Sequence, residues 1–534
     1  MNIMSEKSSR LFVFIFFAFY LLVGLFIYPD YGMSSDEPTS RKNGLVNVKY
    51  IGENIAPFLL TDEITRSPDL YNWKDKDYGV AFEAPVVVLE RLFNIKGSQN
   101  IYTFRHLMTF LFSFGGVVAL YLTAKKVYGD YRVGLLAALM LILTPRMFAE
   151  SFYNSKDIVF MASISMAIYS MTMFLSKCEL KWAIAHGFFT ALAVDIRIMG
   201  VVIFLCTLGA IGVRLFKNGV KPKSDIVVTL AYIVSSGFFV IAMFPYLWGD
   251  PVDHFIIVFK NMSHFRWNSS VLYMGDWVKA AELPWHYVPV WIAVTTPPLF
   301  LILMVVGSLK TIKQLLSNRF SLWSNDREMH DFLHLLLFFG PVLSVIVLSS
   351  VLYDGWRQLY FIYPAFILLS TKGFIVLSDA IRDRYRLAFM FKSTVVLCLF
   401  YNAYWIWNVH PLQNVYFNSF VGSDWRNKFE LDYWGLGNRE AIQYLLENDS
   451  GDVITLKADS RTPLRNTLLI LERGERKRIK LVADEEDAEY LLTSYREVRE
   501  SKDKKYDDHY NLFYQKIIDD EIILSVYKIK PRID

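Results

Sequence analysis

Long apolar stretches separated by short charged ones dominate the first three quarters of the chain. A helix rises about 1.5 Å per residue, so roughly 20 apolar residues cross about 30 Å of hydrocarbon. Runs near this length occupy residues 11–28, 105–124, 133–145, 158–176, 182–195, 198–214, 226–247, 287–308, 331–353, 358–380 and 390–408. The pattern predicts a polytopic α-helical membrane protein with about eleven transmembrane helices. The runs 133–145 and 182–195 are short enough to be tilted, broken or miscounted.

Composition changes after His410, where a polar and charged region extends to the end of the 534-residue chain. Overall 54% of residues are hydrophobic and only 20% are charged, which is typical of a chain largely surrounded by lipid. Past His410 the pattern favours strands at 453–458, 478–482 and 521–529, with helices around 438–447 and 485–493. We therefore expect a transmembrane domain over residues 1–408 and a small α/β domain over residues 409–534.

Positive charge gathers in alternate connections between the predicted helices. Loops rich in Lys and Arg stay in the cytoplasm. Such residues cluster near 7–10, 125–132, 177–181, 214–223, 310–319 and 382–392, all on one side of the predicted membrane. The first run lacks a small-residue cleavage pattern, so we interpret it as an uncleaved anchor. The N-terminus is then cytoplasmic and the C-terminal domain lies on the outer face.

An acidic pair stands in the first outer stretch, residues 29–104. Asp36 and Glu37 lie in the segment MSSDEPTSRKNG, just after the first apolar run. Burying two carboxylates is costly, so packing alone does not explain them. Ser34 and Glu37 also have the spacing of a capping box, with Asp36 in the first turn of a helix, and both interpretations can hold. A stripe from Phe82 to Phe93 in the same stretch predicts a helix in the membrane interface.

Further polar residues share this outer face. They lie in the segments TPRMFAESFYNSKD, DIR and DGWRQ and include Arg146, Lys156, Asp157, Arg197 and Arg357. Asp157 has an alternative role as a helix cap, and the arginines have alternatives as snorkelling residues or as partners of nearby aspartates. Their shared compartment indicates one polar site at the membrane surface.

The layout resembles the GT-C glycosyltransferases that use polyprenyl-phosphate sugars, including protein O-mannosyltransferases and the aminoarabinose transferases that modify lipid A. The resemblance lies in the acidic pair, in Asp157 before the fourth span, in Arg197 after the fifth, and in the turn WRQLYFIYP that opens a late span. Pro38, Thr39 and Ser40 follow the acidic pair in place of an aromatic residue or His, and residues 248–286 are too few for an inserted carbohydrate-binding domain. A bacterial relative is therefore favoured over a eukaryotic-type mannosyltransferase.

This resemblance implies an enzyme of the bacterial plasma membrane that transfers a hexosyl or pentosyl group. The donor would be a polyprenyl-phosphate-linked sugar, and the acceptor a glycan, lipid or protein of the cell envelope. Asp36 corresponds to the family's first-loop acid and is expected to be the base, with Glu37 orienting acceptor or sugar. Arg357 and Arg197 are expected to clamp the donor phosphate, because a guanidinium matches phosphate oxygens, with Arg146 and Lys156 as further candidates.

Other functional classes find less support. The chain has no Walker loop or GxGxxG motif, and its three cysteines form no CxxC pair. The net charge of +4 resides mainly in the inner loops, so nucleic-acid binding is not indicated. His254, His264 and His286 lack neighbouring ligands, so we expect no bound cofactor, with a divalent metal as the alternative. The alternative is a transporter or flippase of a lipid-linked or glycan substrate, which would need charges near the bilayer midplane.

Overall fold

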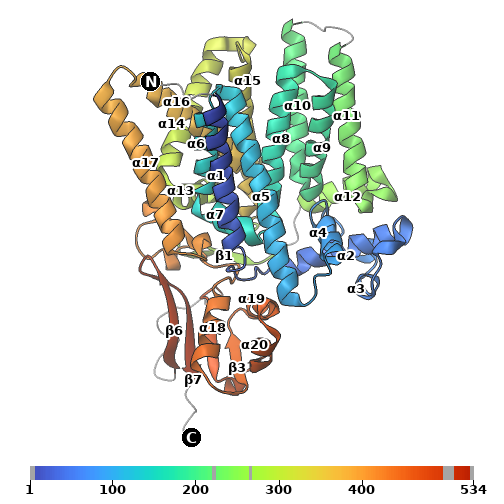
Figure 1. Ribbon diagram of the computed structural model, residues 1–534, viewed down its shortest axis with the longest axis vertical. Helices are drawn as coiled ribbons and strands as arrows, with labels where there is room; N and C mark the ends of the chain where they lie inside the picture. The colour runs from blue at the N-terminus through green and yellow to red at the C-terminus, as the bar shows by residue number, and fades with distance from the viewer. Residues whose placement is uncertain (1–5, 219–223, 264–266, 497–509, 530–534) are drawn as a thin grey trace.

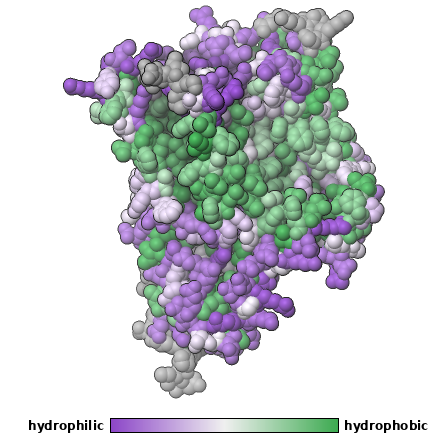
Figure 2. All heavy atoms as spheres, in the orientation of Figure 1, coloured by the Kyte–Doolittle hydropathy of each residue, from purple (hydrophilic) through white to green (hydrophobic). Residues whose placement is uncertain are grey.

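A helical bundle and a smaller sheet-containing domain make up the protein. The computed structural model describes residues 6–218, 224–263, 267–496 and 510–529. The helix that begins the chain starts at the end of the bundle opposite the C-terminal domain (Figure 1). A hydrophobic band crosses the bundle between two hydrophilic ends (Figure 2). This distribution is what a membrane-spanning bundle requires.

The described part of the chain contains nine helices that are long and apolar enough to cross a membrane, or ten if one bent pair is a single span. The nine are built on α1 (Glu6–Ile27), α5 (Ser98–Tyr128), α8 (Asp157–Lys177), α10 (Val201–Asn218), α11 (Ser224–Met243), α14 (Pro298–Asn318), α15 (Asp326–Val347), α16 (Tyr363–Ala380) and α17 (Tyr385–Asn408), and the spans of α10 and α16 also include the 3-10 turns that precede them. α9 (Leu180–Ile196) has 17 residues and packs against α8 and α11. The polytopic helical prediction is confirmed. The count of about eleven is matched only if the bent pair and the short α9 are included.

Proline residues separate consecutive helices at two places in the bundle. α6 (Tyr131–Ile142) and α7 (Pro145–Tyr153) meet at 73°, with Pro145 at the start of α7. The run 287–308, predicted as one span, is two helices, α13 (Tyr287–Thr295) and α14, separated at Pro297 and Pro298. Proline lacks an N–H and fits the first turn of a helix but not its interior, so each proline ends one helix and starts the next.

The outer segment folds into short helices beside the bundle. They are α2 (Glu37–Asn54), α3 (Asp62–Thr65) and α4 (Glu83–Leu92), while α12 (Pro251–Ser263) and the hairpin β1 (Ser270–Tyr273) and β2 (Asp276–Lys279) follow α11. On α4, Leu92 is exposed whereas Val86 is buried within the protein. Glu83 and Glu90 are also buried, because both pair with Arg105 of α5. α4 is therefore anchored to the bundle by ion pairs, and only Pro85 and Leu92 of its residues are exposed.

The C-terminal domain is built on a five-stranded mixed sheet in the order β4-β3-β5-β7-β6. Its elements are α18 (Asn438–Asn448), β3 (Ile454–Ala458), α19 (Arg461–Thr467), α20 (Arg473–Arg478), β4 (Ile479–Leu481), β5 (Tyr490–Thr493), β6 (Tyr510–Ile518) and β7 (Glu521–Ile529). β3 is parallel to β4 and β5, and β7 is antiparallel to β5 and β6. The three predicted strands are confirmed, but the predicted helix at 485–493 is wrong. β5 occupies its second half as a central strand, buried at all four residues.

Between α17 and this sheet, residues 409–436 form irregular structure that packs on the bundle. Leu412, Val415, Trp425 and Trp434 are buried in the same hydrophobic cluster as the membrane helices. The core of the sheet is a separate cluster that includes Ile442, Leu456 and Val526. The connection is therefore part of the membrane domain's packing and brings the C-terminal sheet close to the outer loops.

Candidate active site

Arg357 stands at the centre of a charged cluster. It opens the 3-10 helix η6 (Arg357–Ile362) and its side chain is only 2% exposed. Its Nη1 donates to Asp36 Oδ2 at 3.2 Å and to Asp157 Oδ2 at 2.9 Å, and its Nη2 donates to Asp354 Oδ2 at 3.2 Å. Three segments far apart in sequence thus meet at one guanidinium.

Asp157 joins a second arginine to this centre. Arg197 donates to the other carboxylate oxygen of Asp157, so Asp157 lies between two guanidinium groups. The backbone N–H of Asp157 donates to Asn154 Oδ1 at 2.8 Å, and Lys156, not Asp157, is the N-cap residue of α8, so the Asp157 carboxylate does not serve as the helix cap. The expected alternative pairing of Arg197 with Asp195 is not among the described ion pairs of Arg197, which is paired with Asp157; Asp195 Oδ1 accepts the N–H of Ala81 at 2.6 Å. Arg357 does pair with Asp354, in addition to the other acids.

Lys156 lies beside the cluster, and Arg146 lies elsewhere. The Lys156 ammonium stands over the ring of Tyr78 at 4.1 Å. Arg146 is buried against Phe417 and Trp291 and donates to the carbonyl of Tyr416 at 3.0 Å. The described contacts of Arg146 contain no ion pair with Asp36 or Asp157. Its predicted role at the donor phosphate stays a prediction.

Asp36 is the accessible acid of the cluster. Its side chain is 38% exposed, compared with 1% for Asp157 and 7% for Asp354. Desolvation raises the pKa of Asp36, but the charges of Arg357, Lys156 and Arg197 outweigh it, so the pKa lies below its usual value. The Asp36 carboxylate is therefore ionised at neutral pH and open to a ligand.

Glu37 faces the protein. Its Oε2 accepts the N–H of Ser34 at 2.6 Å and its Oε1 lies 2.9 Å from His106 Nε2, with the residue 2% exposed. α2 begins at Glu37 with Asp36 as its N-cap, so only the Glu37 half of the expected capping box forms. This geometry ties the Asp36 loop to α5.

Several buried N–H donors of the arginines have no partner among the described residues. They are Nε of Arg357, Nε of Arg197 and one Nη of Arg146. A buried donor without a partner lowers stability by about 1–3 kcal/mol, and the cost is larger when the donor belongs to a charged group. Two of these donors belong to Arg357 and Arg197, whose guanidinium groups are of the type that binds a phosphate.

A second acidic site, which the sequence did not predict, lies next to the first. Glu150 of α7 is fully buried and accepts from Tyr360 at 3.0 Å, Tyr433 at 3.1 Å and Asn154 at 2.6 Å. Asn154 also donates to Asp157 at 3.2 Å, which connects the two sites. The available signal was an acid in the middle of TPRMFAESFYNSKD.

A metal site is not formed by the residues the structure describes, since no group of three or more His, Cys, Asp or Glu side chains is placed to hold an ion. His254 contacts the carbonyl of Tyr246, and His286 contacts the hydroxyl of Tyr273. His264 lies outside the described residues.

Comparison with known proteins gives the family context. Residues 90–251 match the family model described as dolichyl-phosphate-mannose-protein mannosyltransferase. The oligosaccharyltransferase of Archaeoglobus fulgidus in its apo form superimposes with a TM-score of 0.50 at 10% identity, covering 87% of this chain and 66% of that one. The predicted resemblance to GT-C glycosyltransferases is confirmed. The bundle thus has the fold of that oligosaccharyltransferase, in a multi-pass integral membrane protein.

Another similar solved structure is ArnT from Cupriavidus metallidurans bound to undecaprenyl phosphate. It shares 12% identity, with 96% of this chain and 97% of that chain covered, at a TM-score of 0.45. No curated protein sequence matches the chain significantly. The chain spans about two thirds of the length of the archaeal oligosaccharyltransferase, at 66%.

Proposed function

We propose that this protein is a membrane glycosyltransferase that moves a sugar from a polyprenyl-phosphate carrier to a hydroxyl-bearing lipid, glycan or protein acceptor. One observation carries the proposal: an accessible carboxylate, Asp36, lies against the buried arginine centre of a GT-C fold. A base and a cationic phosphate site are what this transfer requires side by side.

In the proposed reaction, Asp36 accepts the proton of the acceptor hydroxyl. The acceptor oxygen forms a bond with the anomeric carbon while the bond from that carbon to the phosphate oxygen breaks. The electron pair of the broken bond stays on the phosphate. Arg357, Arg197 and Lys156 stabilise the negative charge that develops there, because their cationic groups already surround Asp36.

Glu37 was expected to orient the acceptor or the sugar, and in this proposal it has a structural role. Both of its carboxylate oxygens are engaged by Ser34 and His106, so it holds the Asp36 loop instead of contacting acceptor or sugar. Asp157 likewise acts through the arginines that it bridges.

The proposal includes an orientation. The proposed catalytic residues belong to the transmembrane domain, residues 1–408. The N-terminus, before α1, is on the cytoplasmic side of the membrane. The C-terminal domain, residues 409–534, and the outer segment, residues 29–104, are both on the outer side. Support comes from the positive charge in alternate loops and from the opposite placement of the N-terminus and the C-terminal domain (Figure 1). We place the protein in a bacterial plasma membrane, where polyprenyl-phosphate sugars would supply the donor.

Release of free polyprenyl phosphate tests the proposal. Purified protein is incubated with a panel of polyprenyl-phosphate sugars and a cell-envelope extract as the acceptor source, with Asp36→Asn as the control. Release by wild type and not by the variant supports the proposed reaction and identifies the donor. If no donor is consumed while the extract sustains a known transferase, the enzyme proposal fails and transport of a lipid-linked substrate becomes the better explanation.

A further inference from the structure

A third arginine reaches the charged cluster, and it comes from the C-terminal domain. Arg496 follows β5, and its Nη2 donates to Asp354 Oδ1 at 2.5 Å. The other oxygen of Asp354 accepts from Arg357. Asp354 therefore lies between one arginine of the bundle and one of the C-terminal domain, 142 residues away in sequence.

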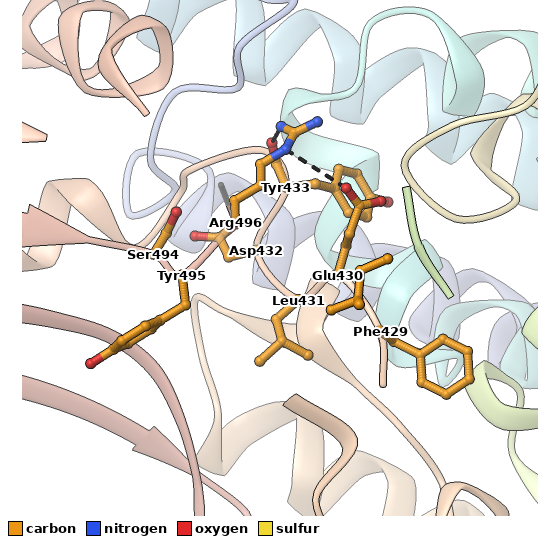
Figure 3. Close-up of a pocket in the computed structure, with 9 residues that line it drawn as sticks. Phe429, Glu430, Leu431, Asp432, Tyr433, Ser494, Tyr495 and Arg496 are labelled. Atoms are coloured by element: carbon orange, nitrogen blue, oxygen red, sulfur yellow. Dashed lines mark hydrogen bonds and ion pairs between the residues drawn. The ribbon is translucent and has the colours of Figure 1, made fainter. Parts of the chain in front are cut away.

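The position of Arg496 is fixed by further contacts. Its Nη1 donates to the carbonyl of Tyr433 at 2.5 Å, and its Nε lies 4.0 Å from Glu430 Oε1. Figure 3 shows the guanidinium of Arg496 between these two groups. Trp434, which follows Tyr433 in the sequence, has its ring centroid 4.6 Å from the guanidinium carbon of Arg357. The same short segment thus contacts both arginines.

The turn that carries Asp354 needs such support. Asp354 has φ of 55° and Gly355 has φ of 72°. A residue other than glycine rarely adopts this left-handed conformation, and it persists where surrounding contacts hold it. Arg357 and Arg496, which both donate to the Asp354 carboxylate, supply those contacts. They fix the position of this carboxylate relative to the Arg357 guanidinium.

The C-terminal domain also holds the loop of Asp36. Arg439 donates to the carbonyls of Pro29 at 2.5 Å and Tyr31 at 2.8 Å. Asn466 donates to the carbonyl of Ser35 at 3.0 Å. Both partners of the Asp36–Arg357 pair are therefore braced from the same domain.

We propose that the C-terminal domain completes the donor site, with Arg496 as the positioning residue that orients Arg357 through Asp354. The inference rests on the proposed function, since it assigns Arg357 to the donor phosphate. A buried ion pair contributes geometry when each member has a fixed partner. Without Arg496, Asp354 keeps one cationic partner and loses its fixed position. Arg357 then has a movable partner at Nη2, while Asp36 and Asp157 still hold Nη1.

The test compares Arg496→Gln with Arg478→Gln. Arg478 is a matched control because its guanidinium donates to backbone carbonyls of Leu446, Asp449 and Gly451 within the C-terminal domain. We expect Arg496→Gln to lower kcat/KM for the donor about tenfold, as loss of an orienting partner commonly does. Arg478→Gln should lower Tm and leave kcat/KM unchanged. Arg496→Lys should recover part of the activity, because an ammonium can still pair with Asp354.

A double-mutant cycle separates positioning from general stability. If Arg496 acts through Asp354, Arg496→Gln added to Asp354→Asn causes no further loss in kcat/KM. The inference is overturned if the fold losses in kcat/KM of Arg496→Gln and Asp354→Asn multiply in the double variant. It is also overturned if Arg496→Gln alone has the wild-type kcat/KM. The proposed function would survive that outcome provided that wild type releases polyprenyl phosphate and Asp36→Asn does not. If wild type releases none, both proposals fall.

Discussion

Replacing Asp36 with Asn keeps the shape of the side chain but removes the negative charge and the ability to accept a proton. A positioned general base contributes roughly 10²–10⁴-fold to a rate, and each tenfold step is about 1.4 kcal/mol of barrier. We therefore expect kcat for polyprenyl phosphate release to fall by 10²–10⁴, about 3–5 kcal/mol. Binding should behave differently, because Arg357, Arg197 and Lys156 lose an anionic neighbour in Asp36→Asn.

The structure sets the sign of the binding effect. Removing a carboxylate from a cationic site strengthens its attraction for phosphate, so the Kd for free polyprenyl phosphate should be unchanged or lower in Asp36→Asn. Folding should be little affected. Asp36 is 38% exposed, its pairing with Arg357 is worth no more than about 1 kcal/mol, and Arg357 keeps Asp157 and Asp354.

The assay measures turnover with a polyprenyl-phosphate sugar, and binding with free polyprenyl phosphate, on the same preparation in detergent. Asp69→Asn is the control, since Asp69 lies in the same outer segment, is 68% exposed and pairs with Lys49 at 2.6 Å. It should match wild type in both measurements. If the Asp36→Asn enzyme keeps a tenth or more of the wild-type kcat, the assignment of Asp36 as the general base is refuted. A variant that loses affinity for polyprenyl phosphate shows that Asp36 serves binding.

Three further predictions follow from the same geometry. Lys156→Gln removes a charge that lowers the pKa of Asp36, so the loss of kcat/KM on acidification should begin at a higher pH than in wild type; an unshifted profile contradicts the assignment. Burial raises the pKa of Glu430 to about 8, so its ionisation destabilises the fold as pH rises from about 4.5 to 8, and Glu430→Gln should flatten the dependence of Tm on pH there. Gly32→Ala should impair turnover, since a Cβ would lie 2.3 Å from the carbonyl oxygen of Leu436, and normal kcat would show that this contact is dispensable.

Hydropathy was sufficient to locate the helices, because a bilayer requires the same apolar length wherever a chain crosses it. All eleven predicted runs overlap helical structure. The errors arise where the apolar length of a run was the only evidence that it forms a single helix. The run 287–308 was apolar throughout, but Pro297 and Pro298 divide it. In the C-terminal domain, β5 was read as helix because a strand buried on both faces lacks the alternation that marks a half-buried one.

Asp36 could be chosen as a candidate from the sequence because an acid beside a membrane span is unusual in itself, and its role as the base stays a prediction. The partners of the other site residues depend on pairing across the fold. Glu37 meets His106, 69 residues later, and Arg496 meets Asp354, 142 residues earlier. A single sequence gives no indication of such distances, so Glu37 was read as a substrate contact and Arg496 was not considered.

The proposed chemistry also explains how a carboxylate with a lowered pKa can serve as the base. A sugar phosphodiester carries one negative charge, and the phosphate that departs carries close to two. As the phosphate gains that charge, Asp36 loses its own by accepting the proton, so the net charge beside Arg357 stays the same through the reaction. Arg357 exchanges its interaction with Asp36 for one with the departing phosphate, and the new charge raises the proton affinity of Asp36 when the proton arrives. The ion pair that holds Asp36 ionised in the resting enzyme is therefore weakened by the reaction itself.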